Sequence, residues 1–113
     1  MTVQQLIDAL SLTVFSLDDP DRQVTGGYCG DLLSWVMGRA PADGAWFTIM
    51  SNVNVAAVAA LTDVTCVVLA EGVVPDPPLL DRARAQGITL LGTELSVYRC
   101  AVRLGGLGIG TDA

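Results

Sequence analysis

The second half of the sequence alternates between short apolar runs and segments with helical spacing. Runs rich in β-favouring residues occupy 45–50, 65–70 and 88–91, and helix-like segments follow them at 52–61, 79–86 and 94–104. Strands that are apolar on both faces and separated by helices are typical of a parallel sheet, because each helical crossover must cover a sheet face. The pattern predicts a three-layer α/β domain with a parallel or mostly parallel sheet. Right-handed crossovers would bring the turns after Met50, Ala70 and Leu91 to one edge, where open α/β sheets usually bind ligands.

The N-terminal third is less regular. Thr2 is placed to cap a helix whose apolar residues follow the i, i+3, i+4, i+7 rule, namely Val3, Leu6, Ile7 and Leu10. A short strand is predicted at 13–15, and the Asp-Asp-Pro-Asp sequence at 18–21 is typical of a turn. A second helix is predicted at 32–37, and Gly38 is expected to end it in a left-handed conformation.

Composition favours one compact domain and excludes many activities. The chain has 113 residues, 51% of them hydrophobic, a net charge of −6, and neither lysine nor histidine. It therefore cannot form a Walker A phosphate loop, a Schiff base on lysine, a Ser-His-Asp or Cys-His catalytic centre, or most zinc sites. We predict no catalytic residue, metal or cofactor, and the acidic balance disfavours nucleic-acid binding. A single domain is expected at 1–104, with a helix stop and a glycine-rich tail at 105–113.

The sequence contains no recognisable secretion signal, and its longest apolar run, 55–61, is far shorter than the ~20 residues that cross a bilayer. Cys29, Cys66 and Cys100 form no CxxC pair, which favours reduced thiols over disulfides. We therefore expect a soluble, cytoplasmic protein without membrane contact. Two interpretations of Cys29 stay open: a thiol whose pKa is lowered at a helix N-terminus, or an ordinary small apolar side chain.

The most distinctive motif runs from Asp21 to Gly27 and reads Asp-Arg-Gln-Val-Thr-Gly-Gly. The two glycines permit positive φ and close approach of the backbone, and Thr25 can hydrogen-bond a turn. In the functional interpretation, Arg22, Thr25 and the N–H groups of Gly26 and Gly27 bind an anion beside a helix N-terminus. In the structural interpretation, the same residues only form a turn that leads into a helix.

Asp21, Arg22, Thr25, Gly26 and Gly27, followed by Tyr28 and the sequence Asp-Leu-Leu-Ser at 31–34, resemble the signature of the DRTGG domain. The resemblance extends over nearly the whole chain, including 36–38, 48–59 and the Gly-Thr-Glu-Leu-Ser sequence at 92–96. It implies a fold similar to the N-terminal, non-catalytic domain of HPr kinase/phosphorylase. The family also occurs beside CBS domains in nucleotide-regulated pyrophosphatases and within some phosphotransacetylases. In these settings the domain accompanies an enzyme without being its catalytic part.

A chain of this length resembles the stand-alone members of the family, some of which are encoded near iron hydrogenase components. Where many relatives are expected to carry a Thr-His-x-Asn-like run, this chain has Ser51, Asn52, Val53 and Asn54. Any role that depends on an imidazole at that place is therefore in doubt.

Two polar clusters follow predicted strands. The first comprises Thr48, Ser51, Asn52 and Asn54, and the second comprises Thr93, Glu94 and Ser96. Both have a structural interpretation as well as a ligand-binding one, since Asn52 and Thr93 are good N-caps and an acidic first turn complements the helix dipole. Carboxylate pairs such as Asp21 with Asp31, or Glu94 with Asp76, are weaker candidates. Trp35 and Trp46 are expected to anchor the core or a subunit interface.

Two functions remain. The first is a non-catalytic regulatory or interaction module, homodimeric, that serves a partner enzyme and senses a small anionic or nucleotide ligand. The resemblance implies this role, and the high apolar fraction makes an exposed apolar patch expected in so small a domain. The second is a small enzyme or carrier that holds a phosphorylated or carboxylated metabolite in an anion cradle formed by Arg22 and the two glycines.

Overall fold

The computed structural model describes residues 1–110. In chain order these residues form α1 (Val3–Leu10), β1 (Thr13–Ser16), β2 (Gly26–Cys29), α2 (Leu33–Arg39), β3 (Gly44–Thr48), α3 (Asn54–Thr62), β4 (Cys66–Leu69), α4 (Pro77–Gln86), β5 (Leu90–Gly92) and α5 (Val97–Gly106).

The strands form one five-stranded sheet in the order β1-β5-β4-β3-β2. β2, β3, β4 and β5 run parallel to one another, and β1 pairs antiparallel with β5, with a register shift between Val14 and Ser16. Cys29 pairs with Phe47 and Thr48 with Leu69, so the carboxyl ends of the parallel strands lie along one edge. The predicted three-layer, mostly parallel α/β fold is confirmed.

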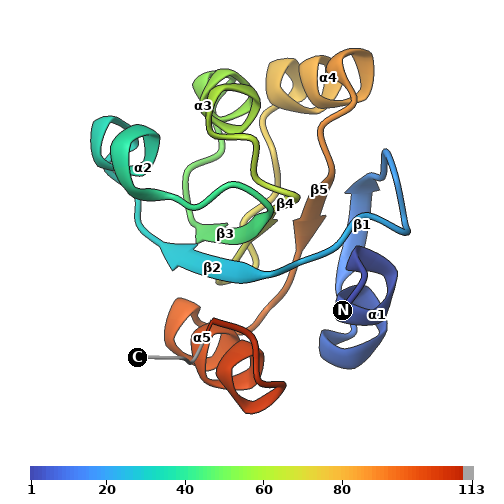
Figure 1. Ribbon diagram of the computed structural model, residues 1–113. Coiled ribbons are helices and arrows are strands. Elements are labelled where there is room, and N and C mark those ends of the chain that lie inside the picture. The colour runs from blue at the N-terminus through green and yellow to red at the C-terminus, as the bar shows by residue number, and fades with distance from the viewer. Residues whose placement is uncertain (111–113) are drawn as a thin grey trace.

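The helices cover the two faces of the sheet unequally (Figure 1). α2, α3 and α4, which connect successive parallel strands, lie on one face. α1 and α5 lie on the other, α1 toward β1 and α5 beneath β2 and β3. Each face has its own apolar core: Trp46, Val67 and Leu90 point toward α2–α4, whereas Phe47 and Leu91 point toward α1 and α5.

Local chemistry explains where the first helix begins. Thr2 Oγ1 accepts a hydrogen bond from the Gln5 backbone N–H, and the Gln5 side chain accepts one from the Thr2 N–H, which completes a capping box. Val3, Leu6, Ile7 and Leu10 are all buried, as their spacing predicts. The turn at 18–21 is also confirmed, since Asp19 Oδ1 accepts from the Asp21 N–H.

Two helix boundaries differ from the predictions because of proline. α2 continues through Gly38, which does not have positive φ, and ends at Arg39. Its C-cap Ala40 has an extended backbone, which the following Pro41 favours. α4 begins at Pro77 rather than Leu79, since the first turn of a helix needs no N–H donors from its residues.

The strand at β2 was not predicted. Gly26 and Gly27, expected in a turn with positive φ, instead pair with Gly44 and Ala45 in an edge strand, and neither has positive φ. Packing explains Gly27, because a Cβ on it would lie 2.6 Å from Leu104 Cδ2. A pair of glycines lacks the alternation of apolar and polar side chains by which a strand is predicted, so the sequence pattern did not indicate β2.

The C-terminal segment differs from a simple tail. α5 extends to Gly106, two residues past the predicted stop at Leu104, and Gly110 lies against β2, where a Cβ on it would be 3.5 Å from Gly26 Cα. The division into a domain at 1–104 and a tail at 105–113 stays a prediction, and residues 111–113 lie outside the described part of the chain.

Candidate functional site

At the amino ends of the parallel strands, Arg22 joins two loops. Its Nη2 donates to Asp43 Oδ1 and Asp63 Oδ1, both at 3.0 Å, and to the Asp63 carbonyl at 2.7 Å. Asp43 and Asp63 stand just before β3 and at the end of α3, and both have left-handed backbones, with φ of 61° and 58°. Partial burial by itself lowers the pKa of Arg22, but the two aspartates outweigh it and raise that pKa. The guanidinium is therefore charged and already paired.

Two other residues of the 21–27 segment bond to the residues just before β3 and β4. The Thr25 N–H donates to the Asp43 carbonyl at 2.9 Å, and the Gln23 carbonyl accepts from Thr65 Oγ1 at 2.6 Å. Asp21 lies in the β1–β2 loop, whereas Asp31 follows the far end of β2, so these two acids do not form a pair across one site. The signature acts here as a connection among the starts of β2, β3 and β4.

The first polar cluster lies at the opposite, carboxyl edge. Thr48, which is fully buried, donates through Oγ1 to Asp31 Oδ1 at 2.7 Å, and the Ile49 N–H donates to the same oxygen at 3.1 Å. Ser51 Oγ donates to Asp76 Oδ1 at 3.1 Å. One carboxylate oxygen of Asp76 is thus bound by Ser51.

The expected cap at Asn52 is wrong by one position. The N-cap of α3 is Val53, which makes no side-chain cap bond, and Asn52 Oδ1 accepts instead from the Asn54 N–H at 2.9 Å. Asn52 therefore forms a local turn before the helix.

The second polar cluster lies farther along the carboxyl edge, and its helix begins later than predicted. α5 starts at Val97 with Ser96 as its N-cap, and Ser96 Oγ accepts from the Arg99 N–H, so Thr93 is not the cap and Glu94 is not in the first turn. The reason is a connection between two loops: the Gly72 N–H donates to the Thr93 carbonyl and the Glu71 N–H to the Leu95 carbonyl, both at 2.9 Å.

Thr93 and Glu94 border a cavity of about 180 Å³ between β1, β5 and the β4–α4 loop; its other lining residues are Thr13, Phe15, Gly72, Val73, Val74 and Gly92. The helices that follow the two neighbouring strands lie on opposite faces of the sheet here: the chain leaves β4 toward α4 on one face and leaves β5 toward α5 on the other. Ligands of open α/β sheets bind beside such a change of direction. Of the ten candidate residues, only Thr93 and Glu94 line this cavity.

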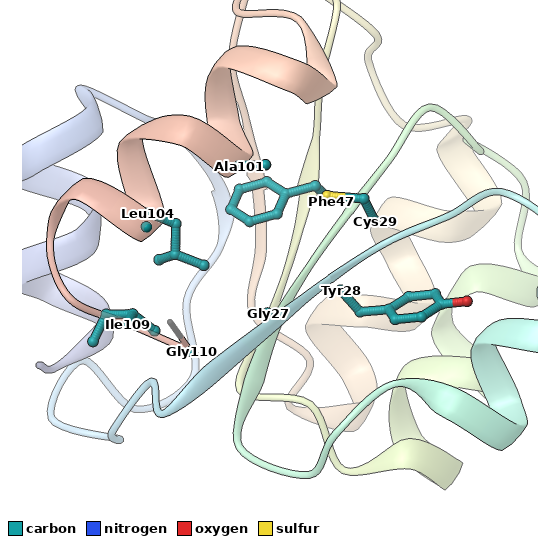
Figure 2. Close-up of a pocket in the computed structure, with 9 residues that line it drawn as sticks. Gly27, Tyr28, Cys29, Phe47, Ala101, Leu104, Ile109 and Gly110 are labelled. Carbon is teal, nitrogen blue, oxygen red and sulfur yellow. The ribbon is translucent and has the colours of Figure 1, made fainter. Parts of the chain in front are cut away.

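A second cavity, of about 220 Å³, lies between β2 and the C-terminal half of α5 (Figure 2). Gly27 and Cys29 contribute from β2, Phe47 from β3, and Ala101 and Leu104 from α5, whereas the Tyr28 ring points to the opposite face. Phe47, Ala101 and Leu104 were not candidates in the sequence analysis, because their spacing is that of ordinary core residues.

The thiol in this cavity does not fit the reactive interpretation. Cys29 lies in a strand rather than at a helix N-terminus, and partial burial together with the charge of Asp31 raises the pKa of its thiol. Neutral thiols are poor nucleophiles, so the structure favours the interpretation of Cys29 as a small apolar side chain.

The two tryptophans have different environments. Trp46 is fully buried and its Nε1 donates to the Gly30 carbonyl at 2.9 Å, so it anchors the core. Trp35 is 53% exposed, with the Arg39 guanidinium 3.9 Å from its ring centroid.

No protein-family model matches the sequence, and no curated protein sequence matches it. Among solved structures, the chain is similar to the CBS and DRTGG domains of the regulatory region of Clostridium perfringens pyrophosphatase, crystallised with the activator diadenosine tetraphosphate. The TM-score is 0.73 with 11% identity over 91% of this chain and 45% of that chain, so this chain spans less than half of that structure. The likeness shows the fold alone: the mostly parallel α/β domain described here has a DRTGG-like fold.

Within residues 1–110, no helix is long and apolar enough to cross a membrane.

Proposed function

We propose that this chain is a non-catalytic regulatory module that serves a partner enzyme. The observation that carries the proposal is the DRTGG-like fold, which extends over 91% of the chain and is similar to a regulatory region. The residues that resemble the DRTGG signature support the same role. We further propose that the chain is a stand-alone, cytoplasmic relative of the N-terminal domain of HPr kinase/phosphorylase. Components of iron hydrogenase systems are the first partners to test.

The proposed module forms a homodimer through α2. Three large apolar side chains are exposed on or beside this short helix: Leu32, Trp35 and Met37. Exposed apolar surface of this kind, centred on an aromatic side chain, is typical of an interface. Sedimentation at micromolar concentration tests the dimer, and Trp35→Ser is expected to shift the protein to the 11.8 kDa monomer. A wild-type protein that sediments only as a monomer contradicts this part of the proposal.

The proposed ligand is a nucleotide held by its nucleoside end at the cavity beside Thr93 and Glu94. A carboxylate accepts hydrogen bonds from ribose hydroxyls and repels phosphate, so the phosphates would point to solvent. The cavity's 180 Å³ suits a sugar or a base rather than a whole nucleotide. A thermal-shift screen with adenosine, adenine nucleotides, phosphorylated metabolites and simple anions tests this. The expected result is a nucleoside-dependent rise in Tm that Glu94→Gln reduces.

The regulatory role itself requires a partner assay. The tagged chain is used to recover its enzyme from the cytosol of its own source, and the activity of that enzyme is measured with and without added chain. A change in activity supports the proposal. Equal activity of the recovered enzyme with and without the added chain contradicts it.

The alternative, an enzyme or carrier with an anion cradle, is disfavoured at the amino edge. A cavity of about 230 Å³ lies beside Arg22, but Asp18, Asp19 and Asp63 also line it, and their charges repel an anion. Arg22 is paired with two aspartates, and Gly26 and Gly27 lie in a paired strand.

A further inference from the structure

α5 has an inner and an outer face of different chemistry. Its inner side buries Cys100 and Leu104 against the sheet. Its outer side carries two rows, each with residues four positions apart: Tyr98 with Val102, and Arg99 with Arg103. Residues so spaced are neighbours on a helix, so an apolar row and a cationic row lie side by side.

The outer face is exposed and hollowed. Tyr98 is 77% exposed and Val102 54%, and both arginines are exposed as well. The four side chains line a shallow hollow of about 240 Å³. Neither Arg99 nor Arg103 forms an ion pair with any described residue, and α5 contains no acidic residue. The patch therefore carries two positive charges without a partner among residues 1–110, on a chain whose net charge is −6.

The stability of the helix does not account for Arg99. It is the third residue of α5, where the positive end of the helix dipole disfavours a cation, whereas Arg103 in the last turn is favoured by the same dipole. Tyr98 likewise gains little from burial. Tyrosine and arginine are, with tryptophan, enriched among the residues that contribute most binding energy at protein interfaces. In such interfaces charged side chains give specificity for the partner.

We propose that the outer face of α5 is the docking surface for an acidic segment of the partner protein, with carboxylates against Arg99 and Arg103 and an apolar side chain in the hollow beside Tyr98 and Val102. The inference rests on the proposed function in that it needs a partner protein.

Charge decides among the possible occupants. Two copies of α5 placed face to face would bring four arginines together, so the surface does not suit self-association. An anionic membrane would attract these arginines but repel the rest of a chain with a net charge of −6. The helix also offers only two large exposed apolar side chains, Tyr98 and Val102, to a lipid surface, fewer than an interfacial helix needs.

The test measures binding of a fluorescein-labelled helical peptide of Glu, Ala and Leu, with its leucines one turn apart and glutamates beside them, by fluorescence anisotropy. A second peptide carries Lys in place of every Glu. The full chain is compared with Arg99→Glu, with the double variant Arg99→Glu and Arg103→Glu, and with Arg82→Glu on α4. Arg82 is also exposed, on another helix, and has no ion pair with a described residue, so Arg82→Glu is matched in charge change. Circular dichroism checks that each variant is folded.

The acidic peptide should bind the wild type and weaken with added salt. Its Kd should rise about tenfold in Arg99→Glu and further in the double variant, with little change in Arg82→Glu. Three results would overturn the proposal: equal binding by the wild type and the α5 variants, equal binding of the lysine peptide, or no peptide binding together with α5-dependent binding to phosphatidylserine vesicles. Dissociation of a wild-type dimer by Arg99→Glu would identify a second copy as the occupant and would also overturn it. Because the peptide assay does not use the partner enzyme, its outcome is separate from that of the recovery experiment.

Discussion

Arg22 and the outer face of α5 place the same side chain in two environments. Arg22 is only 32% exposed, and a single nitrogen of its guanidinium bonds to two aspartates and a carbonyl from loops distant in sequence. Arg99 and Arg103 are exposed and have no ion pair among the described residues. A motif therefore does not by itself assign an arginine to a ligand. Changes near Arg22 should alter stability, and changes on the outer face of α5 should alter binding.

The largest effect is expected from the buried thiol at the start of β4, at the same end of the sheet as Arg22. Burial raises the pKa of Cys66 from 9.0 to about 12, and the charge of Arg22 opposes this only in part. Above pH 9.0 the unfolded chain loses the thiol proton while the native state keeps it. The contribution of Cys66 to stability is thus complete below that pH and is lost at about 1.4 kcal/mol per pH unit until the native thiol titrates.

Urea unfolding at mildly and strongly alkaline pH measures this loss, and Cys66→Val is the control. Cys100, whose pKa burial raises to about 11, contributes equally to both proteins, so the difference in slope belongs to Cys66. Equal slopes for wild type and Cys66→Val would show that the amino end of the sheet does not hold a neutral thiol.

Gly27 connects the two regions, since it lies in β2 and meets the inner face of α5. Gly27→Ala should lower the free energy of unfolding by about 1–2 kcal/mol, because the new Cβ would lie 2.6 Å from Leu104 Cδ2 and the leucine side chain would have to move. Gly38→Ala is the matched control: it lies in α2 with open space around it, and should stabilise the protein by up to about 1 kcal/mol. If both substitutions stabilise, β2 and α5 are not in close contact.

Arg22→Ala should lower stability by about 1 kcal/mol, a modest value because both aspartates are more than half exposed and solvent screens the pairs. Denaturant midpoints measure the change, and Arg22→Lys should restore only part of it, since lysine cannot reproduce the guanidinium geometry. The opposite pattern, unchanged stability with loss of an anion-dependent rise in Tm, would return Arg22 to the ligand-binding role.

The parts of the fold that depend on local pattern were predictable. The alternation from 45 to 92 predicted β3, α3, β4, α4 and β5, and Thr2 predicted the N-cap of α1, because a period or a cap involves residues a few positions apart. Arg22 lies 21 and 41 residues from its two aspartates in the sequence. Gly27 avoids a close contact between a Cβ and the side chain of Leu104 in α5. No local pattern records such long-range contacts. Thr93 and Glu94 were found as candidates, but their cavity depends on Phe15 from the antiparallel edge strand.

The smallest effect on stability should come from Arg99, and it sharpens the comparison with Arg22 most directly. Arg99→Gln removes a cation from the first turn of α5, where the helix dipole disfavours it, and breaks no ion pair with a described residue. The free energy of unfolding should stay within about 0.5 kcal/mol of the wild type, and any change should be a gain. Ser96→Ala, which removes the cap that accepts from the Arg99 N–H, should cost about 1 kcal/mol and shows that unfolding reports on this turn. If Arg99→Gln lowered the free energy of unfolding as much as Arg22→Ala does, Arg99 would also stabilise the fold. The exposure of Arg99 would then no longer support a docking surface on the outer face of α5.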